Sequence, residues 1–119
     1  MTSHESGAGA AADSGLDART RIRIALFLAR RRAGAGQAAP WIPALRERGR
    51  AAGMNGAEML ANEAGTSHEA RATACLAFVA ALLAGAGSAE PGAVRRMHDA
   101  GYRPADIDEV IALVGRDAH

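Results

Sequence analysis

Cys75 is the only thiol of the chain, and Glu58 and Glu63 are among the glutamates that precede it. A thiolate can reduce a peroxide, whereas a pair of carboxylates can serve as general acid and general base in a decarboxylase or isomerase. Arg71 could then hold the carboxylate of a substrate through paired hydrogen bonds. These residue types therefore indicate two candidate chemistries, a one-cysteine peroxide reaction and cofactor-free acid/base catalysis.

Each of these side chains also has a purely structural interpretation. Cys75 stands in the middle of the most apolar stretch, where burial raises the pKa of a thiol and lowers its reactivity, so we expect it to fill the core. Glu58 follows Asn55 by three residues, the spacing of a capping box. Glu63 fits the surface of a helix, and Arg71 could pair with either glutamate. We keep Glu58, Glu63 and Cys75 as candidate catalytic residues beside these alternatives.

The sequence predicts no metal site and no cofactor. One cysteine cannot form an intramolecular disulfide or a thiolate metal cluster. His68 and His98 are the two histidines within the predicted fold, and neither has the helical spacing of a metal-binding pair.

Composition favours a small all-α protein. The chain has 119 residues, of which 49% are hydrophobic but only 3% aromatic, and alanine is its commonest residue. Closely packed helices suit such small side chains better than strands do. The sequence contains no secretory signal and no apolar run of ~20 residues, so we expect a cytoplasmic protein without a membrane partner.

Charge gives little indication of a partner. The formal net charge is +1, and every basic residue apart from histidine is arginine. We interpret Arg30, Arg31 and Arg32 as the solvated end of a helix, where cations complement the helix dipole. Binding to nucleic acid is the weaker alternative, and we expect none.

Residues 71–84 are apolar on nearly every side, which predicts a central helix covered by its neighbours. Thr66 and Glu69 have capping-box spacing before this helix, and Gly85 suits a left-handed end after it.

Five further helices are expected around this one, in a single domain spanning residues 16–119. Residues 1–15 form a predicted disordered tail, since they carry no large apolar residue beyond Met1. The first two expected helices run from Asp17 to about Arg32 and from Pro40 to a stop at Gly53. The next runs from Asn55 to Ala64, with Ala57, Leu60 and either Ala61 or Ala64 inward. The last two run from a cap at Ser88 to Gly101, and onward from Pro104 with Ile107, Val110, Ile111 and Val114 on one face.

Two turn motifs resemble a known family. The Gly-Thr-Ser turn at 65–67 leads into the long apolar helix, and the Ala-Gly-Tyr turn at 100–102 leads into Asp106-Ile-Asp-Glu-Val. In this order and approximate spacing, the chain resembles the AhpD-like, carboxymuconolactone decarboxylase family over roughly residues 17–114. The resemblance implies an AhpD-like helical bundle of about six helices and a homo-oligomer whose subunits complete one another's cores.

The redox members of that family carry Cys-x-x-Cys-x-x-x-His between their first two helices. Counting back from Gly53, the three positions fall on Ala38, Trp41 and Leu45, so both thiols and the histidine are missing. Trp41 could plug the former active-site cavity or form one wall of an apolar pocket beside Leu45, and we favour the plug. Trp41, Leu45 and Arg71 are the candidate ligand-binding residues.

The resemblance implies a family member without the redox dithiol, acting as a small-ligand-binding or structural protein. The alternative is an enzyme of the family, either a peroxide-reducing oxidoreductase or a cofactor-free catalyst acting on a small carboxylate or lactone.

Overall fold

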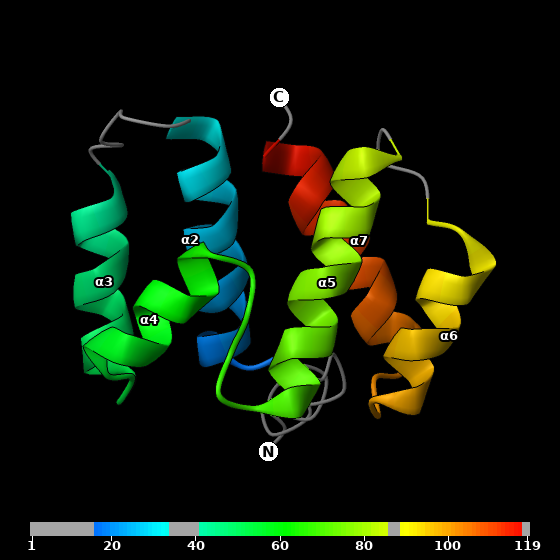
Figure 1. The fold of residues 1–119 in the computed structure, drawn as a ribbon, viewed down its shortest axis with the longest axis horizontal. Helices are drawn as coiled ribbons and strands as arrows, with labels where there is room; N and C mark the ends of the chain where they lie inside the picture. Colours follow the sequence, from blue (N-terminus) through cyan, green and yellow to red (C-terminus); the bar gives the residue numbers. More distant parts are fainter. Residues whose placement is uncertain (1–15, 34–40, 86–88, 118–119) are drawn as a thin grey trace, which may run out of the picture.

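The computed structural model describes residues 16–33, 41–85 and 89–117, and all regular structure in these ranges is helical. The prediction of an all-α fold is confirmed for this part of the chain, whereas the predicted tail at 1–15 lies outside it. The helices are α2 (Ala18–Ala33), α3 (Trp41–Ala51), α4 (Gly56–Glu63), α5 (Ala70–Ala84), α6 (Pro91–Asp99) and α7 (Pro104–Asp117) (Figure 1).

Helix α2 joins two halves of the molecule. Helices α3 and α4 pack on one side of α2 and α5 on another, while α6 and α7 pack against α5 (Figure 1). Leu26 of α2 belongs to the apolar cluster with α3 and α4, whereas Ile24 and Leu28 belong to the cluster with α5, α6 and α7. The side chains of α2 therefore connect the two apolar clusters.

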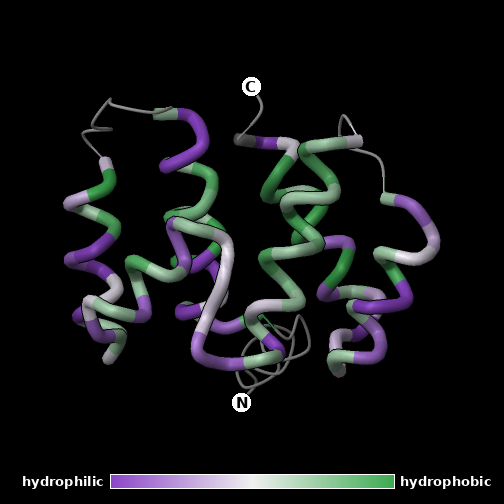
Figure 2. The backbone as a smooth tube through the Cα atoms, viewed as in Figure 1, coloured by the Kyte–Doolittle hydropathy of each residue, from purple (hydrophilic) through white to green (hydrophobic). Residues whose placement is uncertain are grey.

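Helix α5 was expected to be covered by all the other helices. It packs against α2, α6 and α7, but α3 and α4 pack on α2 instead. Helix α5 is hydrophobic along almost its whole length (Figure 2), yet it contributes to only one of the two clusters, through residues such as Leu76 and Val79. Ala77 and Ala84 remain exposed. Alanine carries so little apolar area that leaving a few of them in water costs little, so hydropathy alone overstated how fully this helix is covered.

Several helix ends agree with the sequence. The carboxylate Oδ1 of Asp17 accepts a hydrogen bond from the backbone N–H of Thr20 at 2.8 Å, and Asn55 Oδ1 accepts one from the N–H of Glu58 at 2.8 Å. Gly53 has a φ of 89°, a left-handed conformation that favours glycine after a helix end.

The start and end of α5 differ from the prediction. The Thr66 hydroxyl donates to the carbonyl of Ala61, and Glu69 is the N-cap residue without a side-chain capping bond, so Thr66 and Glu69 form no capping box. The predicted left-handed end is also wrong, because Gly85 has a φ of −96°. The predicted cap Ser88 lies outside the described residues, and α6 instead begins at Pro91.

The largest departure concerns the orientation of α4. The spacing of Ala57 and Leu60 predicted that these residues face inward, but Ala57 is exposed and the exposed fraction of Leu60 is 63%. The buried side of α4 instead carries Met59 and three polar residues, Glu58, Asn62 and Glu63. Arginines from α2 and α3 compensate the buried charges, an arrangement that apolar periodicity cannot reveal.

Candidate functional site

A hollow of about 470 Å³ lies between α2, α3 and α7. Its walls are mostly apolar and come from all three helices, with arginines among them: Ile24, Ala25 and Leu28 with Arg21 from α2, Trp41, Ala44 and Leu45 with Arg48 from α3, and Leu113 with Arg116 from α7. The volume falls within the range of ~300–1,000 Å³ that is usual for small-molecule sites.

Trp41 forms one wall of this hollow and does not plug it. It begins α3 and is 44% exposed, whereas Leu45, one turn further along α3, is buried. The preference for a plug is therefore corrected, while the structure brings Trp41 and Leu45 to the same hollow. A half-exposed indole beside buried aliphatic side chains offers an aromatic face to an incoming apolar group.

Three arginines give the hollow a cationic lining. Arg21 pairs with Glu109 at 2.8 Å, so its charge is partly balanced by α7. Neither Arg48 nor Arg116 takes part in an ion pair among the described residues, and both are exposed. An apolar cavity with unbalanced guanidinium groups at its edge suits a ligand that has an anionic head and an apolar body.

Arg71 does not join this hollow, so the predicted set of three ligand-binding residues is divided. Its guanidinium carbon lies 4.1 Å from the centroid of the Tyr102 ring, a cation–π contact. The Tyr102 hydroxyl donates to the backbone carbonyl of Arg71 at 3.1 Å. Arg71 therefore links the start of α5 to the turn before α7.

Cys75 occupies the core of the α5 cluster, and its exposed fraction is 1%. Burial is the main cause that raises the pKa of its thiol to about 11, so almost none of it is thiolate at neutral pH. This environment agrees with a core side chain and disfavours a peroxide-reactive one.

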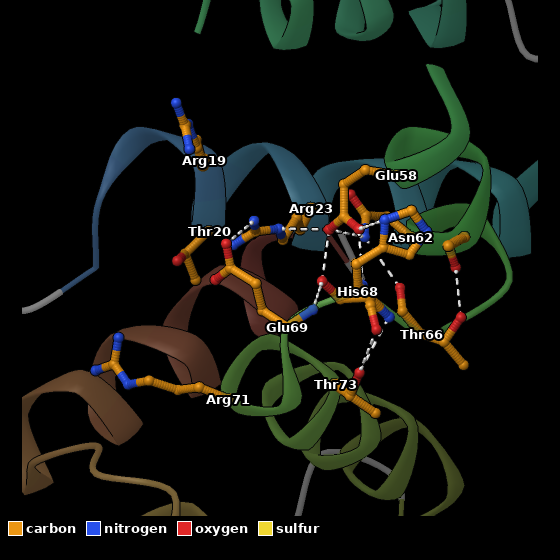
Figure 3. Close-up of polar contacts among 12 residues, drawn as sticks. Arg19, Thr20, Arg23, Glu58, Asn62, Thr66, His68, Glu69, Arg71 and Thr73 are labelled. Atoms are coloured by element: carbon orange, nitrogen blue, oxygen red, sulfur yellow. Dashed lines mark hydrogen bonds and ion pairs between the residues drawn. The ribbon is translucent and has the colours of Figure 1, made fainter. Parts of the chain in front are cut away.

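Glu58 lies at the centre of a buried polar network (Figure 3). Its Oε2 accepts hydrogen bonds from Arg23 Nε at 3.0 Å, Asn62 Nδ2 at 2.9 Å and Ser67 Oγ at 2.5 Å, and its Oε1 accepts from the backbone N–H of His68 at 2.8 Å. Burial by itself would raise the pKa of Glu58, but these donors outweigh it and lower the pKa to about 2. The side chain is thus held as a carboxylate, which is a poor acid or base near pH 7.

Glu63 is bound in the same manner by other arginines. Its carboxylate accepts from Arg46 Nε at 2.9 Å and Nη2 at 3.0 Å, and from Arg30 Nη2 at 3.1 Å. These contacts fasten α4 to α3 and α2, and Glu63 does not line the hollow with Trp41. The structure therefore gives both glutamates a structural role, and it does not bring them together with Trp41.

The spacing of polar residues could have predicted the buried network at Glu58 and Glu63, although the spacing of apolar residues could not. Glu58 and Asn62 are four residues apart and so share a helix face, as do Arg23 and Arg30, which are separated by two turns of α2. An arginine row on one helix and a carboxylate–amide pair on another indicate matching polar faces. No comparable pattern in the sequence predicts that Arg48 and Arg116 line the same hollow, because this depends on how α7 packs.

Comparison of the chain with protein-family models, with curated proteins and with solved structures finds no match. Among the described residues, none of the helices has the length and hydropathy needed to cross a membrane, and no three potential metal ligands cluster together.

Proposed function

We propose that this chain is an AhpD-like helical protein that has lost the redox dithiol and binds a small amphipathic anion between α2, α3 and α7. The observation that carries the proposal is the hollow of about 470 Å³, which combines apolar walls, a half-exposed tryptophan and arginines. Trp41 and Leu45 occupy two of the positions that the family resemblance assigns to redox residues. A site of that family would thus have been converted from catalysis to binding.

The lining indicates the ligand class. Leu28, Leu45 and Leu113 offer aliphatic contact, and Trp41 offers an aromatic face. Arg48 and Arg116 supply guanidinium groups, which prefer the planar two-oxygen geometry of a carboxylate. A medium-chain or aromatic carboxylate combines both requirements.

Binding is favoured over catalysis by the state of the candidate catalytic groups. Glu58 keeps its charge far below neutral pH, Glu63 is shared by two arginines, and the Cys75 thiol is buried. None of the three lines the hollow, and the described residues that do line it are arginines and apolar groups without a proton-transfer residue.

Fluorescence titration tests this proposal, because Trp41 is the only tryptophan of the chain. The probes are sodium decanoate and 1-anilinonaphthalene-8-sulfonate, an aromatic anion that fluoresces when it leaves water. We expect both to change the Trp41 emission, and decanoate to displace the sulfonate. Replacing one charged donor by Arg48→Gln should weaken decanoate binding by about fivefold or more.

Arg50→Gln is the matched control, since Arg50 lies on the same helix but pairs with Glu47 at 2.6 Å. This variant should bind decanoate as the unchanged protein does. Unaltered Trp41 emission with both probes would refute the proposal, and so would equal weakening by Arg48→Gln and Arg50→Gln.

A further inference from the structure

A second, smaller hollow of about 160 Å³ lies on the other side of α2, and polar side chains line it. Arg19 and Arg23 reach it from α2, Asn55 and Glu58 from the start of α4, and His68 and Glu69 from the segment before α5. It shares no lining residue with the hollow at Trp41, so an inference from it is independent of the function proposed above.

Arg23 is the buried cation of this hollow. Its side chain is only 7% exposed, and its Nε donates to Glu58 at 3.0 Å. The outer edge of the guanidinium is engaged much less firmly, because Nη2 lies 3.5 Å from Glu69 Oε2. A guanidinium edge commonly binds a carboxylate through two short parallel bonds, so this edge of Arg23 is only partly used.

Glu69 is suited to leave this position. Its side chain is 61% exposed, and it makes no capping bond to α5 although it is the N-cap residue. Among the residues that the structure describes, the long contact to Arg23 is the one ion pair of its carboxylate (Figure 3). Because the Glu69 carboxylate remains largely in water and its contact with Arg23 is long, Glu69 loses little when this contact opens, whereas the buried Arg23 then needs another anion to replace it.

Arg19 supplies a second guanidinium at the edge of the hollow. Its Nε donates to the carbonyl of Ala52 at 2.8 Å, and it forms no ion pair with any carboxylate of the described residues. A Cβ added to Gly53 would lie 2.7 Å from Arg19 Nη2, so the glycine allows the guanidinium to lie against the turn. Arg19, Arg23 and Glu69 thus line the same small hollow.

We propose that this hollow is a binding site for a small hydrophilic carboxylate, which displaces Glu69 from Arg23 and pairs with Arg23 and Arg19. Glu69 acts as an internal competitor, whose carboxylate occupies the place of the ligand's carboxylate when the site is empty. A volume of about 160 Å³ admits only a molecule of a few heavy atoms. A short hydroxy acid fits this description, with its hydroxyl available to the exposed ring of His68.

Proton NMR of the histidine rings tests the proposal, with sodium lactate as the carboxylate probe and inorganic phosphate as the alternative anion. The His68 signals are assigned by their loss in His68→Gln. We expect lactate to shift the His68 signals in a saturable way, and phosphate to do so only at higher concentration. Glu69→Gln removes the competing charge and should tighten lactate binding roughly two- to fivefold, whereas Arg19→Gln should weaken it.

Glu90→Gln is the matched control for Glu69→Gln. Glu90 is the N-cap residue of α6, it likewise makes no side-chain capping bond, and it does not line this hollow. The proposal is overturned if lactate leaves the His68 signals unchanged in both the unaltered protein and Glu69→Gln. It is also overturned if Glu69→Gln binds lactate no more tightly than Glu90→Gln, or if phosphate binds more tightly than lactate.

Discussion

Glu58 illustrates how a buried charge can be structural without being catalytic. Four hydrogen bonds from side chains and backbone surround it, and the ion pair with Arg23 connects α4 to α2. Removing one partner of a buried ion pair costs much more than the intact pair contributes, because a charge is left without compensation. Glu58, which the sequence made a candidate for acid/base chemistry, therefore stabilises the packing of α4 against α2.

Because the pKa of Glu58 is low in the folded state, the free energy of unfolding should decrease at acidic pH. The pKa is about 2 in the folded state against a usual 4.5. The stabilisation is therefore complete above about pH 4.5, and it is lost as pH falls through about 2. We expect the free energy of unfolding, measured with urea, to decline by about 3 kcal/mol through this group over that range.

Ser67→Ala tests this dependence without removing the carboxylate. The Ser67 hydroxyl donates to Glu58, so its loss should raise the pKa of Glu58 and move the acid-unfolding midpoint to higher pH. At neutral pH the variant should lose about 1 kcal/mol of stability. Thr66→Ala is the control, because Thr66 carries the neighbouring hydroxyl and donates to the Ala61 carbonyl instead. Equal acid midpoints in Ser67→Ala and Thr66→Ala would contradict this account of Glu58.

At the scale of the helices, the sequence predicted where several helices begin and end better than it predicted which side of each helix is buried. The caps at Asp17 and Asn55 and the left-handed glycine at Gly53 depend on a few adjacent residues, which the sequence displays directly. The buried face of α4 depends on arginines more than ten residues away in α2 and α3, so its own periodicity pointed to Leu60. The separation of the core into two apolar clusters on either side of α2 likewise depends on tertiary packing. Alanine-rich segments give little indication of which neighbours they will contact.

Gly49 shows how closely α3 approaches α4. It is buried within α3, and an added Cβ would collide with the Sδ atom of Met59, itself 1% exposed. Gly115 in α7 is exposed, and an added Cβ there would meet no atom within 4 Å. The two glycines therefore form a matched pair in which only one marks a helix contact.

We expect opposite effects of alanine at these positions. Gly115→Ala should stabilise the protein by up to about 1 kcal/mol, because alanine favours a helix over glycine. Gly49→Ala should destabilise it by about 1–3 kcal/mol despite the same gain in helix propensity, because Met59 must be displaced from a packed core. Thermal unfolding of both variants measures the difference. A stabilising Gly49→Ala would mean that α3 and α4 are less closely packed than described.

The residues of the candidate site could likewise be predicted where they lie close together in the sequence, but not where they come from distant helices. Trp41 and Leu45 were predicted together because both fall on positions of the family's redox motif, and the structure places both at the same hollow. Arg71 was assigned to the same site from its charge, yet it stacks on Tyr102 elsewhere. Residues from α7 complete the hollow, and no feature of the sequence relates α7 to α3.

At the scale of the whole molecule, the outer side of α4 is apolar where a monomer would normally present polar groups. Ala57 and Ala64 are exposed beside Leu60, whose exposed fraction is 63%. The polar side chains that would usually cover this side of an amphipathic helix are instead buried against α2 and α3. Exposed apolar residues of this kind are a candidate contact surface for the homo-oligomer that the family resemblance predicts, which stays a prediction.

The oligomeric state can be tested through Leu60. We expect light scattering coupled to gel filtration to give a mass that is a multiple of the 12.2 kDa chain, and Leu60→Arg to shift the population toward the monomer. Ala112→Arg is the control, because Ala112 is an exposed alanine on α7, away from α4. The substitution at Leu60 should leave the helical circular dichroism unchanged, since its side chain contributes little to the described core. A monomeric unaltered protein would remove the support for association, and an oligomer that survives Leu60→Arg would show that subunits meet through a face other than α4.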